Sequence, residues 1–459
     1  MPNTLAYLML IFWPVIGFII AKKYDPAKAL SLLIIVPYLL LPVKVGINPP
    51  LLPSISKQEL LAITAFIFLY KARKKFIFIP TNLLLKCLVF LLFITPFVTV
   101  ITNREHLIYS GYALPGLGLT DLVGMLFYNL TLFYLPLILG YNFLNQKDSL
   151  QSFISILIIC GLVYSIPILW EVRVSPQLHK QVYGFFPHSW VQQIRQGGFR
   201  PVVFLGHGLY VAVFISIVAV AAVAFFKLKL PPMKKYRLPK LLFLMAVVVL
   251  CKTWSAYIFA AIGTVVILIF RARFWLTCAT LFASLVLLYP MLRSANVIPV
   301  TSIVSTFAQY SEARASSLNF RIVNEDILLE KARQKPLAGW GGWGRARVRD
   351  PVTGGDLSTI DGVWILIFGE SGWLGYFAKI GLLCAPVLVL YSRVRRSQNI
   401  KEYYPAIIVA LLLSLNMLDQ IPNSSLNPVT VLMAGALMGY NPKKKRTDIE
   451  SPVIGNKGA

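Results

Sequence analysis

Residues 293–361 read RSANVIPVTSIVSTFAQYSEARASSLNFRIVNEDILLEKARQKPLAGWGGWGRARVRDPVTGGDLSTID, and residues 362–375 continue GVWILIFGESGWLG. The first of these stretches is polar and basic, in a chain that otherwise consists of apolar runs joined by short polar segments. A loop of this length between two membrane spans is typically either functional or disordered. This loop contains a helical pattern, tryptophan–glycine turns and a basic tract. We therefore interpret the apolar runs as a scaffold that holds the loop at a membrane surface.

Composition places the chain among helical membrane proteins. Of its 459 residues, 57% are hydrophobic and 14% are charged, and the mean hydropathy is +0.70. A soluble domain carries about 25% charged residues. The first apolar run lacks a basic leader and a cleavage site, so we interpret it as a retained span. The predicted fold class is an all-α polytopic membrane protein with about 12–13 transmembrane helices.

Thirteen apolar runs are predicted to be transmembrane helices. They cover residues 4–21, 29–46, 59–71, 82–101, 120–144, 149–171, 206–226, 239–252, 254–270, 274–292, 362–391, 403–419 and 425–440. Ten spans therefore fall within residues 1–292, with a polar joint at 172–205. The large loop at 293–361 follows, then three spans within residues 362–440 and a tail at 441–459.

Lysine and arginine cluster on alternate joints between these spans. The clustered joints are 22–28, 71–75, 147, 227–240, 271–273, 393–401 and 443–446. The positive-inside rule places them in the cytoplasm, with the C-terminus inside and the N-terminus outside. The two long loops then lie on the outer face, which long loops can reach regardless of their charge. Their basic residues suit either an anionic ligand or anionic lipid headgroups. We do not interpret the net charge of +26 as nucleic-acid binding.

The joint at 172–205 contains the glycine-rich turn QGGFRP, in which Arg200 precedes the next span by a few residues. Arg200, with Arg195 upstream, is a candidate to hold an anionic group. An arginine near a span end also snorkels to lipid headgroups, which is the alternative. His207 lies at the mouth of the same span, and it is either a hydrogen-bonded structural histidine or a general base.

The large loop contains one predicted helix that carries two arginines. The serine pair at 316–317 is suited to its N-cap, and the helix is expected to end near residue 333. Arg314 and Arg321 are seven residues apart and share a face if the helix begins earlier. Glu325 follows Arg321 by four residues, so we expect it to hold the Arg321 guanidinium.

This helix is followed by a turn of glycine and tryptophan, GWGGWG at 339–344. Trp340 and Trp343, together with Tyr310, are candidates either to bind sugar rings or to anchor the loop at the membrane interface. Asp361 lies at the mouth of the next span and Glu370 lies inside it. Ionisable groups in such places are functional candidates.

The chain offers no recognisable metal site or disulfide framework. All five cysteines fall inside apolar runs, and none has CxxC spacing. The sequence contains no Asp-x-Asp motif and no cluster of histidine and cysteine. We therefore expect the protein to use neither a metal nor another cofactor.

Three of these motifs occur in an order that resembles the O-antigen ligase and O-antigen polymerase superfamily of bacterial membrane glycosyltransferases. The motifs are Arg200 in its glycine-rich turn, Arg321 ahead of Pro336, Gly339 and Gly341, and Glu370 with Gly372 and Gly375 at the opening of a span. The resemblance covers roughly residues 195–392. Arg195 and Gly206, and also Arg333 and Gly344, are separated by ten residues as in polymerases. Asp361 and Gly362 stand where the ligase branch has histidine and asparagine.

The resemblance implies a GT-C-like enzyme in the bacterial inner membrane, with its active site facing the periplasm. Its donor would be a glycan carried on undecaprenyl diphosphate. A polymerase would transfer this glycan to another lipid-linked glycan, and a ligase would transfer it to a lipid A core. Other expected partners are membrane lipids and further polysaccharide assembly proteins. The departure at Asp361 either argues against ligase-type catalysis or gives Asp the role of the base, and the spacing of arginine and glycine favours the polymerase.

The candidate residues suit this chemistry. A diphosphate leaving group needs stabilisation of its developing charge, and arginine forks can provide it without a metal. Arg200 and Arg321 are the first candidates, with Arg195 and Arg314 behind them. A base must also accept the proton of the acceptor hydroxyl.

Asp361 is the first choice for this base, and His207 and Glu370 are the alternatives. Asp361 is equally suited to cap the following helix by accepting the backbone N–H of Val363 or Trp364.

Two other classes of function remain alternatives. A flippase for lipid-linked oligosaccharides would also have about a dozen spans, but it would show internal repeats and charges within its spans. We find no convincing repeat, and the charges concentrate in one loop. A non-catalytic assembly partner is the third class.

The charge pattern predicts the orientation of the chain in the membrane. A reporter fused after Lys335 is expected to be accessible from outside the cell, and a reporter fused after Arg395 only from the cytoplasm. Protease protection and cysteine labelling in intact cells measure both positions. The opposite pattern would contradict the assignment of the long loops to the outer face.

Overall fold

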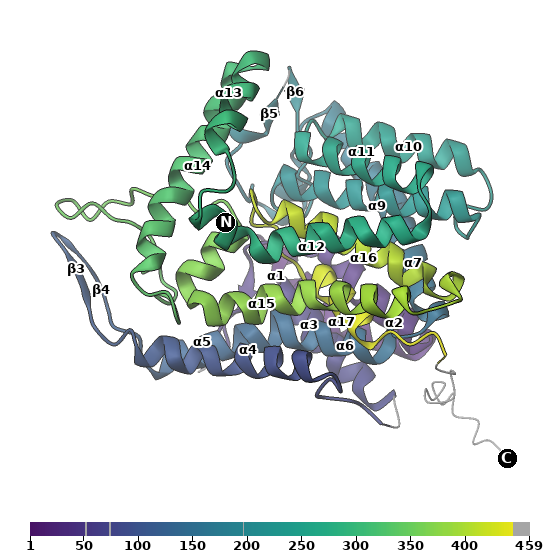
Figure 1. Ribbon diagram of the computed structural model, residues 1–459, viewed down its shortest axis with the longest axis horizontal. Helices are drawn as coiled ribbons and strands as arrows, with labels where there is room; N and C mark the ends of the chain where they lie inside the picture. Colours follow the sequence, from purple (N-terminus) through teal and green to yellow (C-terminus); the bar gives the residue numbers. More distant parts are fainter. Residues whose placement is uncertain (51–52, 73–74, 196, 444–459) are drawn as a thin grey trace.

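The computed structural model describes residues 1–50, 53–72, 75–195 and 197–443, and for residues 310, 313 and 314 it describes the backbone only. Helices dominate this part of the chain, and its strands form three separate two-stranded hairpins. Figure 1 shows the long helices lying side by side along one direction. The predicted fold class, an all-α polytopic membrane protein, is confirmed.

Each of the thirteen predicted spans corresponds to a helix or to a continuous helical run. These are α1 (Thr4–Lys23), α2 (Pro26–Leu40), α3 (Lys57–Leu69), α4 (Leu83–Ile101), α5 (Leu119–Tyr128) with the π-helical η2 (Asn129–Tyr134) and α6 (Leu135–Phe143), α7 (Lys147–Arg173), α9 (Gly208–Leu228), α10 (Arg237–Leu250), α11 (Trp254–Ile269), α12 (Ala272–Ser294), α15 (Val363–Arg395), α16 (Tyr404–Asp419) and α17 (Pro428–Gly439). In the described chain, eight helices or runs are long and apolar enough to cross a membrane, and α2, α11 and α17 are shorter apolar helices.

Polar residues before the apolar runs explain where several spans begin. Asn3 and Asn82 each accept a backbone N–H as the N-caps of α1 and α4. Ser56 and Glu59 form a capping box at the start of α3. Such caps satisfy backbone N–H groups that the first helical turn leaves without a partner.

The joints between spans gather at two opposite ends of the bundle. At one end Arg393, from a basic joint, donates to the Tyr440 carbonyl at 3.1 Å. At the other end Arg321 of the large loop donates to the Pro422 carbonyl at 3.0 Å. In Figure 1 the N-terminus lies near the end that carries α14, and the last described residues lie at the opposite end. Which face of the membrane each end occupies stays a prediction.

Short elements form the loop end of the bundle. They are β1 (Gly46–Ile47) with β2 (Ile55–Ser56), β3 (Leu107–Tyr109) with β4 (Tyr112–Leu114), α8 (Leu178–Tyr183), η3 (Val191–Gln193), β5 (Ile194–Arg195) with β6 (Gly198–Phe199), α13 (Val300–Tyr310) and α14 (Glu312–Arg333). The short helices η1 (Tyr70–Ala72) and η4 (Ile400–Tyr403) belong to other joints.

The large loop contains two helices where one was predicted. Ser311 has an extended backbone and is the N-cap of α14, so the predicted N-cap at residues 316–317 is wrong. The additional helix α13 has apolar residues at 300, 303, 304 and 307, which is a helical spacing. That spacing was the signal for this helix.

Helix α15 is broken at Gly372, whose backbone angles (φ 59°, ψ −161°) are not helical. The large loop satisfies the backbone groups that this break releases. Trp373 donates its N–H to the Pro336 carbonyl at 2.8 Å, and Leu374 donates to the Leu337 carbonyl at 3.1 Å. A helix interrupted inside a bundle needs such partners, because unsatisfied backbone groups are costly away from water.

The loop also donates two hydrogen bonds back to α15. The N–H of Trp340 reaches the Gly369 carbonyl at 2.9 Å, and the N–H of Gly341 reaches the Glu370 carbonyl at 2.9 Å. We call these four hydrogen bonds between residues 336–341 and 369–374 the loop clip.

Two glycines permit the loop clip. A Cβ on Gly339 (φ +70°) would lie 2.4 Å from the Glu370 carbonyl carbon. A Cβ on Gly372 (φ +59°) would lie 2.4 Å from the Leu337 carbonyl carbon. The glycines in the two sequence motifs are therefore explained by two backbones in direct contact, in conformations that other residues rarely adopt.

Replacing Gly339 tests the loop clip. We expect Gly339→Ala to destabilise the protein by at least about 1 kcal/mol, because a left-handed Ala is itself unfavourable and its Cβ would clash with α15. Gly342→Ala is the matched control, since a Cβ there meets nothing within 4 Å. Thermal unfolding of the purified variants in detergent measures the difference. Equal Tm values for both variants would refute the importance of this contact.

Candidate functional site

Arg321 and Asp361 face each other at the loop end of the bundle. Arg321 of α14 places its Nε 3.7 Å from Asp361 Oδ2. Its Nη1 donates to the Pro422 carbonyl at 3.0 Å and to Asn423 Oδ1 at 3.3 Å. The Arg321 and Asp361 side chains are 31% and 33% exposed, so a ligand can reach this ion pair.

Asp361 does not cap α15. Gly362 is the N-cap, and it makes no side-chain hydrogen bond. The N–H of Val363 donates to the carbonyls of Gln420 and Asn423, at 3.0 and 3.2 Å. The predicted alternative, in which Asp361 accepts a helix N–H, is therefore wrong. The carboxylate lies beside Arg321 instead.

Glu325 does not hold Arg321, contrary to the sequence-based expectation. It is buried, accepts a hydrogen bond from Trp364 Nε1 at 3.2 Å, and lies 3.9 Å from Arg293 Nε. Burial raises the pKa of Glu325 to about 7, although the Trp364 hydrogen bond and Arg293 act in the opposite direction. Glu325 therefore fixes α14 against α12 and α15, and this contact helps to position Arg321.

Arg200 approaches the same region from the loop that precedes α9. Its backbone N–H donates to the Gln193 carbonyl at 2.8 Å, and its side chain packs against Gly208, where a Cβ would be 2.2 Å from Arg200 Cδ. Burial, together with the charges of Arg195 and Arg321, lowers the pKa of Arg200 to about 10. Arg200 remains protonated at neutral pH, and the positive charges of Arg195 and Arg321 repel that of Arg200.

The Arg200 guanidinium is poorly satisfied by the protein. Among the described residues, its buried Nε has no hydrogen-bond partner. Buried donors are usually paired, so this group can accept a ligand that brings an anionic oxygen. We call Arg195, Arg200 and Arg321 the arginine cluster. Of the three, Arg195 on β5 is exposed.

His207 is part of the same region but is held as a neutral hydrogen-bonding group. It is the N-cap of α9, and its Nδ1 accepts the N–H of Leu209 at 3.0 Å. Its ring packs edge-on against His188 with centroids 4.5 Å apart. Burial, together with His188 and the charges of the three arginines, lowers the pKa of His207 to about 3. A neutral ring whose Nδ1 accepts must carry its proton on Nε2, so His207 is placed as a donor.

The loop between α16 and α17 supports the ion pair, and sequence analysis did not identify it. Asp419 accepts hydrogen bonds from Asn423 Nδ2 at 2.7 Å and from the Ser425 hydroxyl at 2.8 Å. Tyr210 of α9 donates to the Ser424 carbonyl at 2.7 Å. Asn423 in turn accepts from Arg321. The polar run DQIPNSS at the end of a span was the available signal.

Glu370 belongs to a different group of side chains. Its electrostatic neighbours are Lys379 and Arg347, not the arginine cluster. It also lines a separate cavity next to the α15 break. The structure thus gathers Arg195, Arg200, Arg321, His207 and Asp361 and leaves Glu370 apart.

Trp340 has a packing role rather than the predicted sugar-binding role. The residue is 7% exposed, and its Nε1 donates to the Lys331 carbonyl at 2.8 Å. The ammonium groups of Lys331 and Lys335 lie over its ring, 3.6 and 4.6 Å from the centroid. Trp343 in contrast is 76% exposed. The side chains of Tyr310 and Arg314 lie outside the described part of the chain.

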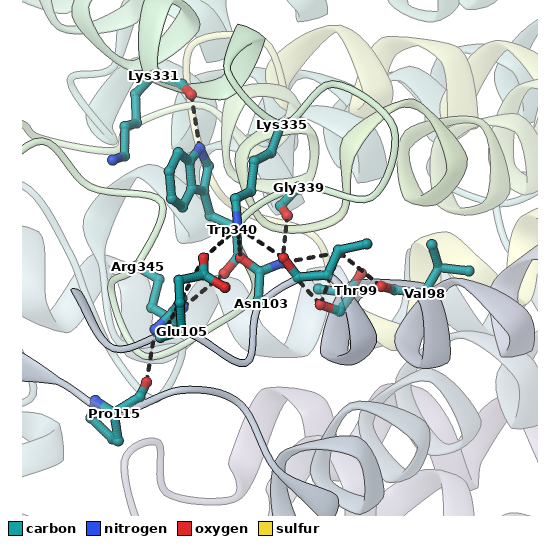
Figure 2. A network of polar contacts seen from close by, with 11 residues as sticks. Val98, Thr99, Asn103, Glu105, Pro115, Lys331, Lys335, Gly339, Trp340 and Arg345 are labelled. Carbon is teal, nitrogen blue, oxygen red and sulfur yellow. Dashed lines mark hydrogen bonds and ion pairs between the residues drawn. The ribbon is translucent and has the colours of Figure 1, made fainter.

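Figure 2 shows how the segment around Trp340 is tied to the end of α4. Glu105 lies between two cations, with Lys335 Nζ at 2.5 Å and Arg345 Nη2 at 3.3 Å from its carboxylate. Burial opposes ionisation, but the Lys335 hydrogen bond and the charge of Arg345 lower the pKa of Glu105. Asn103 Nδ2 also donates to the Gly339 carbonyl at 2.9 Å. This network holds the loop clip in place.

No family model, no curated protein and no solved structure matches this chain. The chemistry of the site must therefore be inferred from the residues themselves. Arg200 interacts electrostatically with Arg195 and Arg321, the three arginines act on the neutral His207, and the partly exposed Asp361 lies beside Arg321. Such an arrangement can bind a multiply charged anion and leave one base beside it.

The arginine cluster predicts that inorganic pyrophosphate raises the Tm of the purified protein. At a concentration 100 times its Kd, a ligand stabilises by about 2.7 kcal/mol. We expect Arg200→Ala and Arg321→Ala each to abolish most of this shift. Arg104→Ala is the control, because Arg104 is exposed in another joint at the same end.

Thermal unfolding with and without pyrophosphate measures the shift in all four proteins. An undiminished shift in both cluster variants would disprove an anion site at this position.

Proposed function

We propose that this protein is a membrane glycosyltransferase of the O-antigen polymerase and ligase type. It extends a bacterial surface polysaccharide, an O-antigen or an exopolysaccharide, by transferring glycan from undecaprenyl diphosphate to a lipid-linked acceptor at the periplasmic face. The observation that carries this proposal is the meeting of Arg200 and Arg321, from two separate loops, with Asp361 beside them. Arg200 has a buried Nε without a partner, and Arg321 has a carboxylate at 3.7 Å.

The arginines would act on the leaving group. The bond between the sugar C1 and the diphosphate oxygen breaks, and negative charge accumulates on the diphosphate. Guanidinium groups held by the fold stabilise this charge without reorganising during the reaction. His207 can add a hydrogen bond through Nε2. The released product is undecaprenyl diphosphate.

Asp361 would act on the acceptor. The acceptor hydroxyl oxygen forms the new bond to C1, and its proton passes to the Asp361 carboxylate, which later releases it to water. Arg321, whose Nε lies 3.7 Å from Asp361 Oδ2, orients this carboxylate. A weak base is sufficient here, because the hydroxyl becomes acidic only as its bond to the sugar forms.

Lipid-linked glycan supplied to the purified protein in liposomes tests the function. A polymerase forms longer lipid-linked chains, and a ligase forms product only when lipid A core is added. A flippase moves glycan across the bilayer without forming new glycosidic bonds. We expect chain extension, and we expect it to persist with EDTA because the arginines replace a metal. Absence of any new glycosidic bond would disprove the transferase proposal.

Asp361→Asn separates the catalytic role from the structural one. Asparagine keeps the size of the side chain but cannot accept the proton, so chain extension should fall by about 100-fold or more. Asp356→Asn is the matched control, because Asp356 lies in the same loop and also pairs with an arginine, Arg347. Initial rates at equal protein levels measure both variants. Parental activity in Asp361→Asn would disprove the role of Asp361 as the base.

A further inference from the structure

A cavity lies at the loop end of the bundle, apart from the arginine cluster, and the proposed transfer does not use it. It encloses about 910 Å³ between α4, α5 and α15. Ligand cavities in proteins commonly measure roughly 300–1,000 Å³. Its apolar wall includes Leu92, Pro96, Met125 and Ala378. These residues belong to membrane-spanning helices, so the wall suits a hydrocarbon chain.

The cavity borders the lipid side of the bundle. No residue of α5, which forms one wall, is buried. Leu119 and Val123, which line the cavity, are 75% and 39% exposed. The cavity is therefore open along α5, and a lipid chain can reach it there.

Polar groups line the cavity near the α15 break. Lys379 is 8% exposed, and its Nζ reaches back to Ser371 Oγ at 3.5 Å. Ser371 and Lys379 are eight positions apart, and the α15 break at Gly372 lies between them. An ammonium group has three donors, and this long contact leaves capacity for a ligand oxygen. Glu370, which interacts electrostatically with Lys379, lines the cavity at the same level as Ser371.

The mouth of the cavity carries an exposed aromatic ring. Trp343 is 76% exposed, and its Nε1 donates to Asp121 Oδ1 at 2.5 Å. The hydrogen bond fixes the orientation of the indole while its face stays accessible. Such a face offers an apolar platform for a sugar ring, and the neighbouring carboxylate can accept hydroxyl hydrogen bonds.

Charge distinguishes this cavity from the arginine cluster. Its lining has two acidic residues, Asp121 and Glu370, and one basic residue, Lys379. Arg347, which also interacts with Glu370, is paired with Asp356. The cavity therefore has no surplus positive charge with which to hold a phosphate or sulfate group.

We propose that this cavity binds an amphiphile with a hydrocarbon chain and an uncharged, hydroxyl-rich head, such as a glycolipid. The chain lies between α4, α5 and α15. The head meets Glu370, Lys379 and Asp121 and stacks on Trp343. This proposal rests on the cavity and does not require the transferase activity.

Two photoreactive probes with the same diazirine-bearing alkyl chain test the proposal, one an alkyl glucoside and the other an alkyl phosphate. The purified full-length protein in nanodiscs is irradiated with each probe, and labelled peptides are identified by mass spectrometry. We expect the glucoside to label α4, α5 and α15 about tenfold more than the phosphate, which corresponds to about 1.4 kcal/mol. Preferential labelling by the phosphate would overturn the proposal and assign the cavity to an anionic lipid.

Filling the cavity provides the matched comparison. Gly124 lines it, and a Cβ there meets nothing within 4 Å. Gly124→Phe should therefore fold and should reduce glucoside labelling of these helices about tenfold. Val163→Phe places the same ring on α7 at a residue that is 62% exposed and outside the cavity, and it should leave labelling unchanged.

Trp343→Ala is a second variant that does not disturb the interior. It should reduce the preference for glucoside over phosphate, because it removes the sugar platform but not the apolar wall. Equal labelling of the Gly124→Phe and Val163→Phe proteins would overturn the proposal. Equal labelling by both probes in the parental protein would also overturn it.

Discussion

The contact between two backbones at the α15 break is the constraint on which the loop end of the molecule depends. Four hydrogen bonds join residues 336–341 to residues 369–374. They satisfy groups that the break at Gly372 exposes, and they fix the segment that leads from α14 back to α15. Because α14 carries Arg321 and α15 follows Asp361 directly, the same contact sets how the site residues meet. The glycines of the two motifs therefore have a structural role: they permit this backbone contact, and they affect the site only through the positions of α14 and α15.

Buried charge around this contact is balanced locally. Arg345 is almost completely buried, and its donors reach Trp340, Pro115 and Glu105. A buried guanidinium without such partners would be strongly destabilising. Arg200 differs from this pattern, since its buried Nε lacks a partner among the described residues. This contrast between a fully satisfied arginine and an incompletely satisfied one favours a ligand-binding role for Arg200.

The two polar regions at the loop end differ in charge and surroundings. The arginine cluster combines three cations with the Asp361 carboxylate. The cavity near Glu370 combines one lysine with two carboxylates inside apolar walls. Glu370 was grouped with the catalytic candidates from sequence, because a motif places it close to Asp361 along the chain. Its electrostatic neighbours are instead Lys379, beyond the α15 break, and Arg347 of the large loop.

The sequence by itself determined the class of the fold and the position of its spans, because hydrocarbon length and charge bias are local properties of a chain. It also gave Arg200, Arg321 and Asp361 as candidate site residues, since the order of the motifs can be read directly from the sequence. The sequence could not determine which side chains contact one another. Glu325 was expected to hold Arg321 from helical spacing, but Asp361 and the loop after α16 hold it. Trp340 was expected either to bind sugar or to anchor the loop at the membrane interface, but two lysines and a backbone carbonyl contact it. The partners of Arg321 lie about 40 to 100 positions away along the chain, and only tertiary packing decides which of several compatible side chains a charged group meets.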